Sequence, residues 1–103
     1  MSVVTLYVPT TAPAPLVAES LAAAKAMFAK LFGGYTVVKG EGGWFNEAGD
    51  LVEEPVYLVT SYTDKHIALY GRAVGELASM IARALAQECV AVVFDNDMVF
   101  YKP

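Results

Sequence analysis

Two stretches with helical periodicity, each set between strand-like segments, constrain this chain more than any other feature. In the first, from about 15 to 32, apolar residues recur at spacings of 4, 3, 4 and 3, at Val17, Leu21, Ala24, Phe28 and Leu31. In the second, from about 65 to 87, the spacings are 4, 3, 4 and 4, at Tyr70, Val74, Leu77, Ile81 and Leu85. Each predicted helix therefore has one face suited to cover a sheet.

Five strand-like segments surround these helices, at 3–8, 35–40, 56–62, 89–94 and 98–102. A glycine-rich hairpin with a turn near 47–50 joins the second to the third, and Asp95-Asn96-Asp97 joins the last two. Right-handed crossovers place both helices on one face of an antiparallel sheet. We therefore expect a single domain, 1–103, with an α+β ferredoxin-like two-layer sandwich and an extra C-terminal strand.

The segment Val56–Tyr62 carries apolar or aromatic side chains at both alternating positions, so both faces of that strand are apolar. Hydrophobic residues make up 56% of the chain, against about 45–50% in typical domains. If both helices cover one face, the other lacks intrachain cover. We expect this uncovered face to carry Tyr7, Tyr57 and Val59 and to be buried in a homodimer.

Charge and targeting signals exclude some partners. There are 11 acidic and 7 basic residues, a net charge of −4, which disfavours binding to nucleic acid. The N-terminal segment has no basic region, and no apolar run approaches the roughly 20 residues of a membrane span, so we expect a cytoplasmic protein without membrane contact. The single cysteine, Cys89, excludes an intrachain disulfide and is interpreted as a structural residue of a buried strand.

Catalytic and metal-binding motifs are not visible. His66 is the only histidine, which excludes a His-pair metal site, and no serine lies in a nucleophile elbow. Residues 41–54 contain five acidic residues and no Lys or Arg, which indicates a solvated acidic hairpin, with a weak cation site as the alternative. We therefore assign no catalytic residue, metal or cofactor from the sequence.

Small residues form a further stripe on the second helix, at Gly71, Gly75, Ala78, Ala82 and Ala86. The first helix has alanines at comparable offsets. Small side chains allow helix backbones to approach closely, so we expect the stripe to serve helix–helix packing, with a ligand groove as the alternative.

The hairpin carries a motif of Gly42-Gly43-Trp44, then Gly49, then Glu53-Glu54-Pro55, and Gln87-Glu88 precedes Val90 near the end. Together with Phe32-Gly33-Gly34, this pattern resembles a family of small bacterial domains of unknown function over about two thirds of the chain. The resemblance implies that Trp44, Gly49, Glu54 and Glu88 belong to the family motif, with either a structural role or a place in a ligand pocket. It implies no activity.

Two hypotheses from different classes follow. The first is a non-enzymatic oligomeric binding module that holds a small molecule or a partner protein at its sheet face or subunit seam, such as a phage or mobile-element accessory protein. The second is a small cofactor-independent enzyme that uses Tyr57, Glu54 or His66 for proton transfer. The candidate ligand-binding residues are Trp44, Glu54, Tyr57 and His66.

Overall fold

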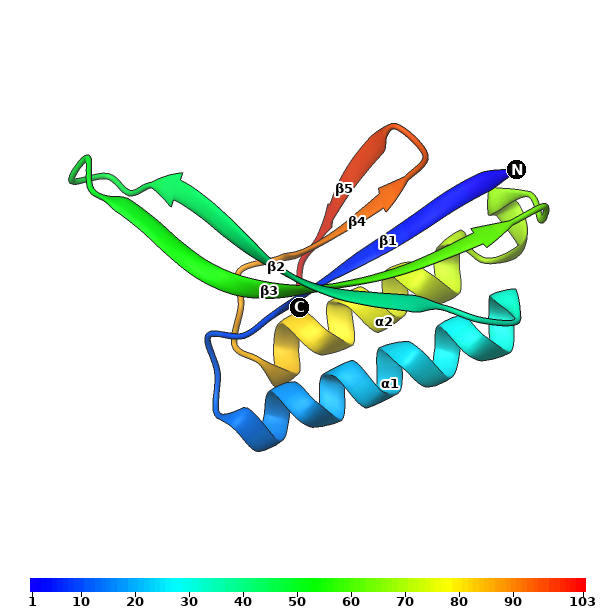
Figure 1. Cartoon of the computed structure of the whole chain (residues 1–103), viewed down its shortest axis with the longest axis horizontal. Helices are drawn as coiled ribbons and strands as arrows, with labels where there is room; N and C mark the ends of the chain where they lie inside the picture. The colour runs from blue at the N-terminus through cyan, green and yellow to red at the C-terminus, as the bar shows by residue number, and fades with distance from the viewer.

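Five strands and two long helices follow one another in the predicted order in the computed structural model, which describes all residues from 1 to 103 (Figure 1). The elements are β1 (Ser2–Pro9), α1 (Ala14–Phe32), β2 (Thr36–Phe45), β3 (Leu51–Thr63), the 3-10 turn η1 (Ile67–Leu69), α2 (Gly71–Ala84), β4 (Val90–Phe94) and β5 (Asp97–Tyr101). The strands form one antiparallel sheet in the order β2-β3-β1-β4-β5. The predicted ferredoxin-like sandwich is confirmed, with β5 as the extra strand beside β4.

Both long helices lie on the same face of the sheet, side by side (Figure 1). Val4, Leu6 and Val8 of β1 point toward them and are fully buried. The predicted stripe of the second helix is buried along its whole length, and Val17, Ala24 and Phe28 of the first are buried with it. Leu21 and Leu31 pack at the margin of this core. The apolar stripes read from the sequence are therefore the surfaces that cover the sheet.

The second helix is shorter than predicted. It begins at Gly71 rather than near residue 65, because Ile67–Leu69 form a separate 3-10 turn in which the Nδ1 atom of His66 accepts a hydrogen bond from the Ala68 amide at 3.1 Å. At its other end Ala86 adopts a left-handed φ of 53°, and the Gln87 amide donates to the Ala82 carbonyl at 2.8 Å. This reversal directs the chain into β4.

The stripe of small residues is used differently from the prediction. The matching alanines of α1, at 18, 22, 26 and 29, are exposed rather than packed against α2. Gly75 instead faces β5, where an added β-carbon would lie 2.5 Å from the Tyr101 Cε1 atom. The missing side chain at Gly75 thus allows the Tyr101 ring to pack on α2 and attaches the last strand to the helical layer.

The face of the sheet away from the helices has no cover from the rest of the chain, and strand register decides which side chains lie on it (Figure 1). Leu6 pairs with Val59 and Val8 pairs with Tyr57, so these two β3 residues share the helix-covered face. Val59 is fully buried in the core and Tyr57 packs beside it. The prediction that Tyr57 and Val59 lie on the uncovered face is therefore wrong, whereas Tyr7 does lie there.

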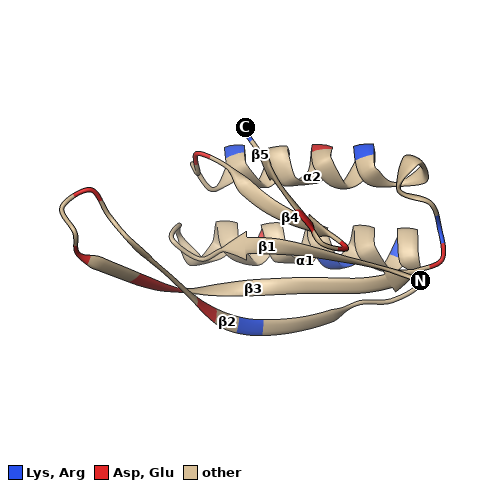
Figure 2. Cartoon of the chain, turned by 90° about the horizontal axis from the view of Figure 1, so that it is seen from above, with Lys and Arg blue, Asp and Glu red and all other residues tan.

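We call this uncovered side of the sheet the open face. The alternating positions of all five strands supply it with Val3, Thr5, Tyr7, Val38, Trp44, Glu54, Val56, Leu58, Thr60, Tyr62, Ala91, Val93, Met98 and Phe100. Glu54 is the only charged residue in this set. The Lys and Arg positions concentrate on the helices and the Asp and Glu positions on the β2–β3 hairpin and in turns, whereas β1 carries no charge (Figure 2).

Candidate functional site

The outer half of the β2–β3 hairpin extends beyond the ends of the two helices (Figure 1). We call this segment, residues 41–54, the arm. Its two strands stay paired up to Phe45 and Leu51, and the turn is closed by the Asn46 side chain, whose Oδ1 atom accepts a hydrogen bond from the Asp50 amide at 2.9 Å. Gly49 adopts a φ of 83° in this turn, which favours glycine. No helix lies beneath the arm, so its position depends on the hairpin itself.

A groove forms on the open face between the arm and the β4–β5 hairpin. It has a volume of about 720 Å³ and is lined by Tyr7, Pro9, Gly42, Gly43, Trp44, Glu54, Val56, Gln87, Cys89, Val90, Ala91, Met98 and Phe100. This volume lies within the range of about 300–1,000 Å³ typical of small-molecule sites. Because its walls come from β2 and β5, the two outermost strands, the groove depends on the curvature of the whole sheet.

Aromatic side chains stand at both ends of this groove. Trp44 is on the arm and is 48% exposed, while Phe100 is on β5 and is 62% exposed. Tyr7, on the central strand β1, contributes the part of the lining between them. Half-exposed rings of this kind gain burial when a flat apolar molecule enters between them, which makes them suited to ligand contact.

Glu54 supplies the only carboxylate of the groove. It pairs across the hairpin with Gly42, and a β-carbon at Gly42 would approach nothing closer than the Glu54 carbonyl oxygen at 3.9 Å. The glycine therefore leaves the space beside Glu54 open. The chain's one ion pair joins Arg72 to Glu76 on α2, so the Glu54 carboxylate has no cationic partner within the chain. A positively charged group of a ligand can approach it directly.

The base of the arm is fixed to the end of β1. The Thr10 hydroxyl donates a hydrogen bond to the Pro55 carbonyl at 2.6 Å, next to Glu54. The Gln87 side-chain amide donates to the Thr11 hydroxyl at 3.3 Å and to the Leu85 carbonyl at 3.0 Å. These contacts hold the segments before α1 and after α2 against the groove wall that Gln87 lines.

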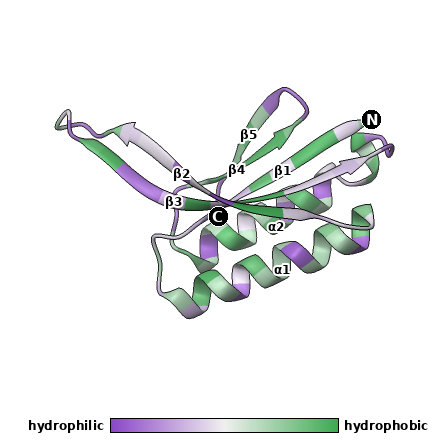
Figure 3. Cartoon of the chain, in the orientation of Figure 1, coloured by the Kyte–Doolittle hydropathy of each residue, from purple (hydrophilic) through white to green (hydrophobic).

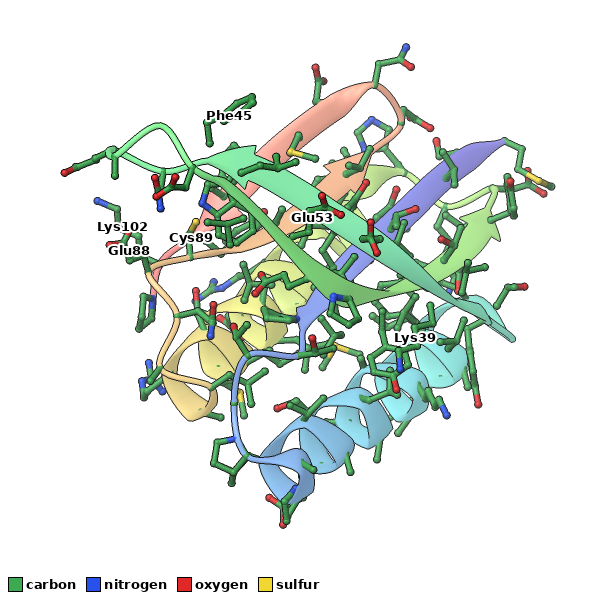
Figure 4. The ribbon with its side chains drawn as sticks, turned by 60° about the vertical axis from the view of Figure 1, so that its left-hand side comes forward. Lys39, Phe45, Glu53, Glu88, Cys89 and Lys102 are labelled. Carbon is green, nitrogen blue, oxygen red and sulfur yellow. The ribbon has the colours of Figure 1, made fainter.

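Cys89 lies at the groove rather than within the core. It precedes the first residue of β4, is partly exposed and is a free thiol. Figure 4 shows it at the base of the arm, in the region where Glu88 and Lys102 are also found, while Phe45 stands at the far end of the arm. The interpretation of Cys89 as a buried strand residue is therefore replaced by a place in the groove lining.

The four candidate ligand-binding residues are distributed over three parts of the molecule. Trp44 and Glu54 lie together in the groove. Tyr57 is on the opposite face of the sheet, where the Lys39 Nζ atom lies 5.6 Å from its ring centroid. His66 caps η1 and lines a separate hollow with Ser2, Asp95 and Asp97. Of the three residues considered for proton transfer, only Glu54 faces the groove.

Several groove residues were not identified as site residues from the sequence. Met98 and Phe100 are recognisable as strand residues, yet only the pairing of Val93 with Met98 and of Ala91 with Phe100 places them on the open face. The register set by the Asp95–Asp97 turn is the signal from which they could be found. Their proximity to the arm depends on sheet curvature, which alternation of side chains does not encode.

Two tyrosines outside the groove have shifted pKa values. Burial raises the pKa of the Tyr70 hydroxyl, and the negative charge of Asp95 raises it further, while a hydrogen bond with Ser2 acts in the opposite direction. Burial also raises the pKa of Tyr101. Both rings belong to the helix-covered side, where Tyr70 stacks edge-on against Phe32 with ring centroids 5.0 Å apart. These shifts therefore reflect core packing.

A second hollow of about 660 Å³ lies along α2, lined by Gly71, Arg72, Gly75, Glu76, Ser79, Met80, Arg83 and Tyr101. Only two of these eight lining residues are hydrophobic, compared with eight of thirteen in the groove. No three His, Cys, Asp or Glu side chains converge anywhere in the chain. None of the helices combines the length and apolar character that crossing a bilayer requires. The groove is therefore the better candidate for a small-molecule site.

Comparison with known proteins shows the fold but no family. No protein-family model matches the chain, in line with its resemblance to domains without a known function, and no curated protein matches it. Two solved structures do: a phage SAM lyase in complex with S-methyl-5'-thioadenosine, with a TM-score of 0.69, and a phage SAM lyase in the apo state, with a TM-score of 0.68. Each is 15% identical and covers 99% of this chain and 89% of its own. The likeness shows a shared fold.

Proposed function

We propose that this protein is a small-molecule binding module and that its ligand carries a flat ring and a positive charge. The observation that carries the proposal is the groove itself, a hollow of about 720 Å³ in which apolar and aromatic walls surround one carboxylate. Sites for small molecules combine mostly apolar walls with a few polar groups that fix orientation. The ring is expected to lie against Trp44 and Phe100.

The charge preference follows from Glu54. A carboxylate bordered by apolar walls interacts with a cation more strongly than the same group in open water, because less solvent screens the pair. The neighbouring aromatic faces of Trp44 and Tyr7 also attract cations through their ring quadrupoles. A neutral ligand of the same shape gains only the apolar part of this binding.

The shared fold suggests one ligand class with these properties. One of the similar structures contains S-methyl-5'-thioadenosine, which is a purine nucleoside with a neutral thioether. S-adenosylmethionine adds a positively charged sulfonium to the same ring system. Sulfonium nucleosides therefore supply both the ring and the charge that the groove favours, and the shared fold also supports a role as a phage or mobile-element accessory protein.

Intrinsic fluorescence tests this proposal because Trp44 is the only tryptophan in the chain and lines the groove. Titration with S-adenosylmethionine and with S-methyl-5'-thioadenosine should each change the Trp44 emission in a saturable way. Glu54→Gln should weaken the cationic ligand by about tenfold, a loss of about 1.4 kcal/mol, and leave the neutral one nearly unchanged. Phe100→Ala should weaken both.

Phe45→Ala is the matched control, since Phe45 is also an exposed aromatic but pairs with Leu51 on the other side of the arm. It should leave both affinities unchanged. Protection of Cys89, the single thiol, from a thiol reagent gives a second readout of an occupied groove. If neither ligand changes the emission, the heat of mixing or the Cys89 reactivity at millimolar concentration, the sulfonium nucleoside proposal fails.

A second candidate is an enzyme that cleaves the sulfonium, favoured by the fold shared with a lyase and by the Glu54 carboxylate in the groove. In an elimination, Glu54 would take a proton from the carbon next to the one bound to sulfur. That C–H pair would form the new double bond, and the C–S pair would pass to sulfur to give the neutral thioether. Chromatography of S-adenosylmethionine incubated with the protein tests this: S-methyl-5'-thioadenosine should form, and Glu54→Gln should abolish its formation. Binding without turnover supports the module instead.

A further inference from the structure

Half of the open-face side chains named above lie outside the groove and are not covered by any other part of the chain. They are Val3, Thr5, Val38, Leu58, Thr60, Tyr62 and Val93. None of them is charged, and Val38 and Tyr62 are 56% and 67% exposed. Figure 3 shows hydrophobic segments along the middle of the sheet, whereas the arm carries a hydrophobic segment at the start of β3 next to a hydrophilic one. Contiguous apolar surfaces of this kind mark contact sites for other molecules.

The polar groups at the centre of this surface are already satisfied. The Thr5 and Thr60 hydroxyl oxygens, on the paired strands β1 and β3, lie 3.0 Å apart and share a hydrogen bond. A buried hydroxyl without a partner is costly, but these two provide one for each other. The centre of the open face can therefore be covered by an apolar surface with little loss of hydrogen bonding.

The distribution of charge points to the identity of the partner. A foreign protein that recognised this surface through charge complementarity would need charged groups on it, and it has none outside the groove. The acidic residues responsible for the net charge of −4 lie on the helices, the arm and the turns (Figure 2). Two copies can therefore meet with their uncharged faces together and most of their carboxylates at the rim. We propose that the open faces of two copies pack against each other in a homodimer.

The available area suits a weak dimer when the contact covers the whole open face, groove lining included. Five strands about 4.8 Å apart, each contributing on average about seven residues at about 3.3 Å, give a surface of roughly 24 by 23 Å, or about 550 Å² per copy. The total of roughly 1,100 Å² lies just above the approximately 1,000 Å² expected of a specific interface. Association should therefore depend on concentration in the micromolar range.

Sedimentation velocity over about 1–300 µM tests the proposal. The wild-type protein should shift from the 11.0 kDa chain toward twice that mass as concentration rises. The double variant Val38→Glu/Tyr62→Glu should remain monomeric at every concentration, because it would place unpaired carboxylates within the contact. Both positions are exposed in the single chain, so circular dichroism should show the variant to be folded.

Leu69→Glu/Met80→Glu is the control, since these exposed apolar residues lie on the helical side of the molecule. It should dimerise like the wild type. A wild type that stays monomeric at about 300 µM, an assembly of another size, or dissociation by the control variant to the same extent would each overturn the homodimer. Val38 and Tyr62 do not line the groove, so substituting them tests the dimer without changing the residues that are proposed to bind the ligand.

Discussion

The two faces of the central strand β1 differ sharply although both are largely apolar. Val4, Leu6 and Val8 are fully buried under the helices, whereas Val3, Thr5 and Tyr7 of the same strand retain solvent contact on the open face. The difference shows that residue type does not determine burial in this sheet. Burial is determined by which face the helices cover, and the apolar side chains left on the other face are available for binding.

The largest effect is expected when a phenylalanine is replaced by alanine on each of the two faces and the two losses of stability are compared. Phe28→Ala removes a fully buried ring of α1 and should lower the free energy of unfolding by about 3–5 kcal/mol. Phe100→Ala removes a ring that is 62% exposed on the open face and should lower it by about 1 kcal/mol or less. Urea unfolding of both variants at the same low protein concentration measures the two values. Equal losses would mean that the open face is part of the folding core.

A smaller test concerns the contact that attaches β5 to the helical layer. Gly75→Ala places a β-carbon 2.5 Å from the Tyr101 ring and should lower the free energy of unfolding by about 1–2 kcal/mol, because overpacking exceeds the gain in helix propensity. In a Tyr101→Ala background the same change should stabilise the protein by about 0.5–1 kcal/mol. Thermal unfolding of the wild type, the two single variants and the double variant checks this reversal of sign. A destabilising Gly75→Ala in both backgrounds would show that its space is filled by something other than Tyr101.

The smallest test uses pH to probe the covered face. Because the folded protein raises the pKa of Tyr70, the native state holds this proton more tightly than the unfolded chain, whose tyrosines titrate near pH 10. The associated stability is present below about pH 10 and is lost as the pH rises through the folded pKa. Urea unfolding between about pH 9 and 11 should show that the free energy of unfolding decreases, and the decrease should be smaller in Tyr70→Phe. If the decrease is the same in the variant, it arises from other titrating groups.

The order of elements could be predicted because helix and strand periodicities are local properties of the sequence. The face assignment of Tyr57 and Val59 could not, because β3 has apolar side chains at both alternating positions. Only the pairing of Leu6 with Val59 shows which set meets the helices, and this pairing involves residues more than fifty positions apart. Where both faces of a strand are apolar, the sequence predicts the strand but not which of its faces packs against the helices.

The candidate site could be predicted only where its residues lie close together along the chain. Trp44 and Glu54 lie near each other along the hairpin, and the sequence motif names both as candidates. Cys89, Met98 and Phe100 join them through the curvature of the sheet, which brings its two outer strands to one groove. The predicted start of the second helix also failed, because the local hydrogen bond from the Ala68 amide to the His66 ring favours a separate 3-10 turn.

The composition of β2 bears on the solubility of the folded protein. As the outermost strand on its side, β2 presents unpaired backbone amides and carbonyls along its length, which can template fibrillar growth by addition of strands from other molecules. Two features of β2 oppose this strand addition. It contains three glycines, which have a low propensity for strands, at Gly40, Gly42 and Gly43. It also carries two charged residues, Lys39 and Glu41, which disfavour the stacking of identical strands. Replacing these residues with valine or isoleucine would therefore make the edge strand β2 a site from which amyloid-like aggregation can start.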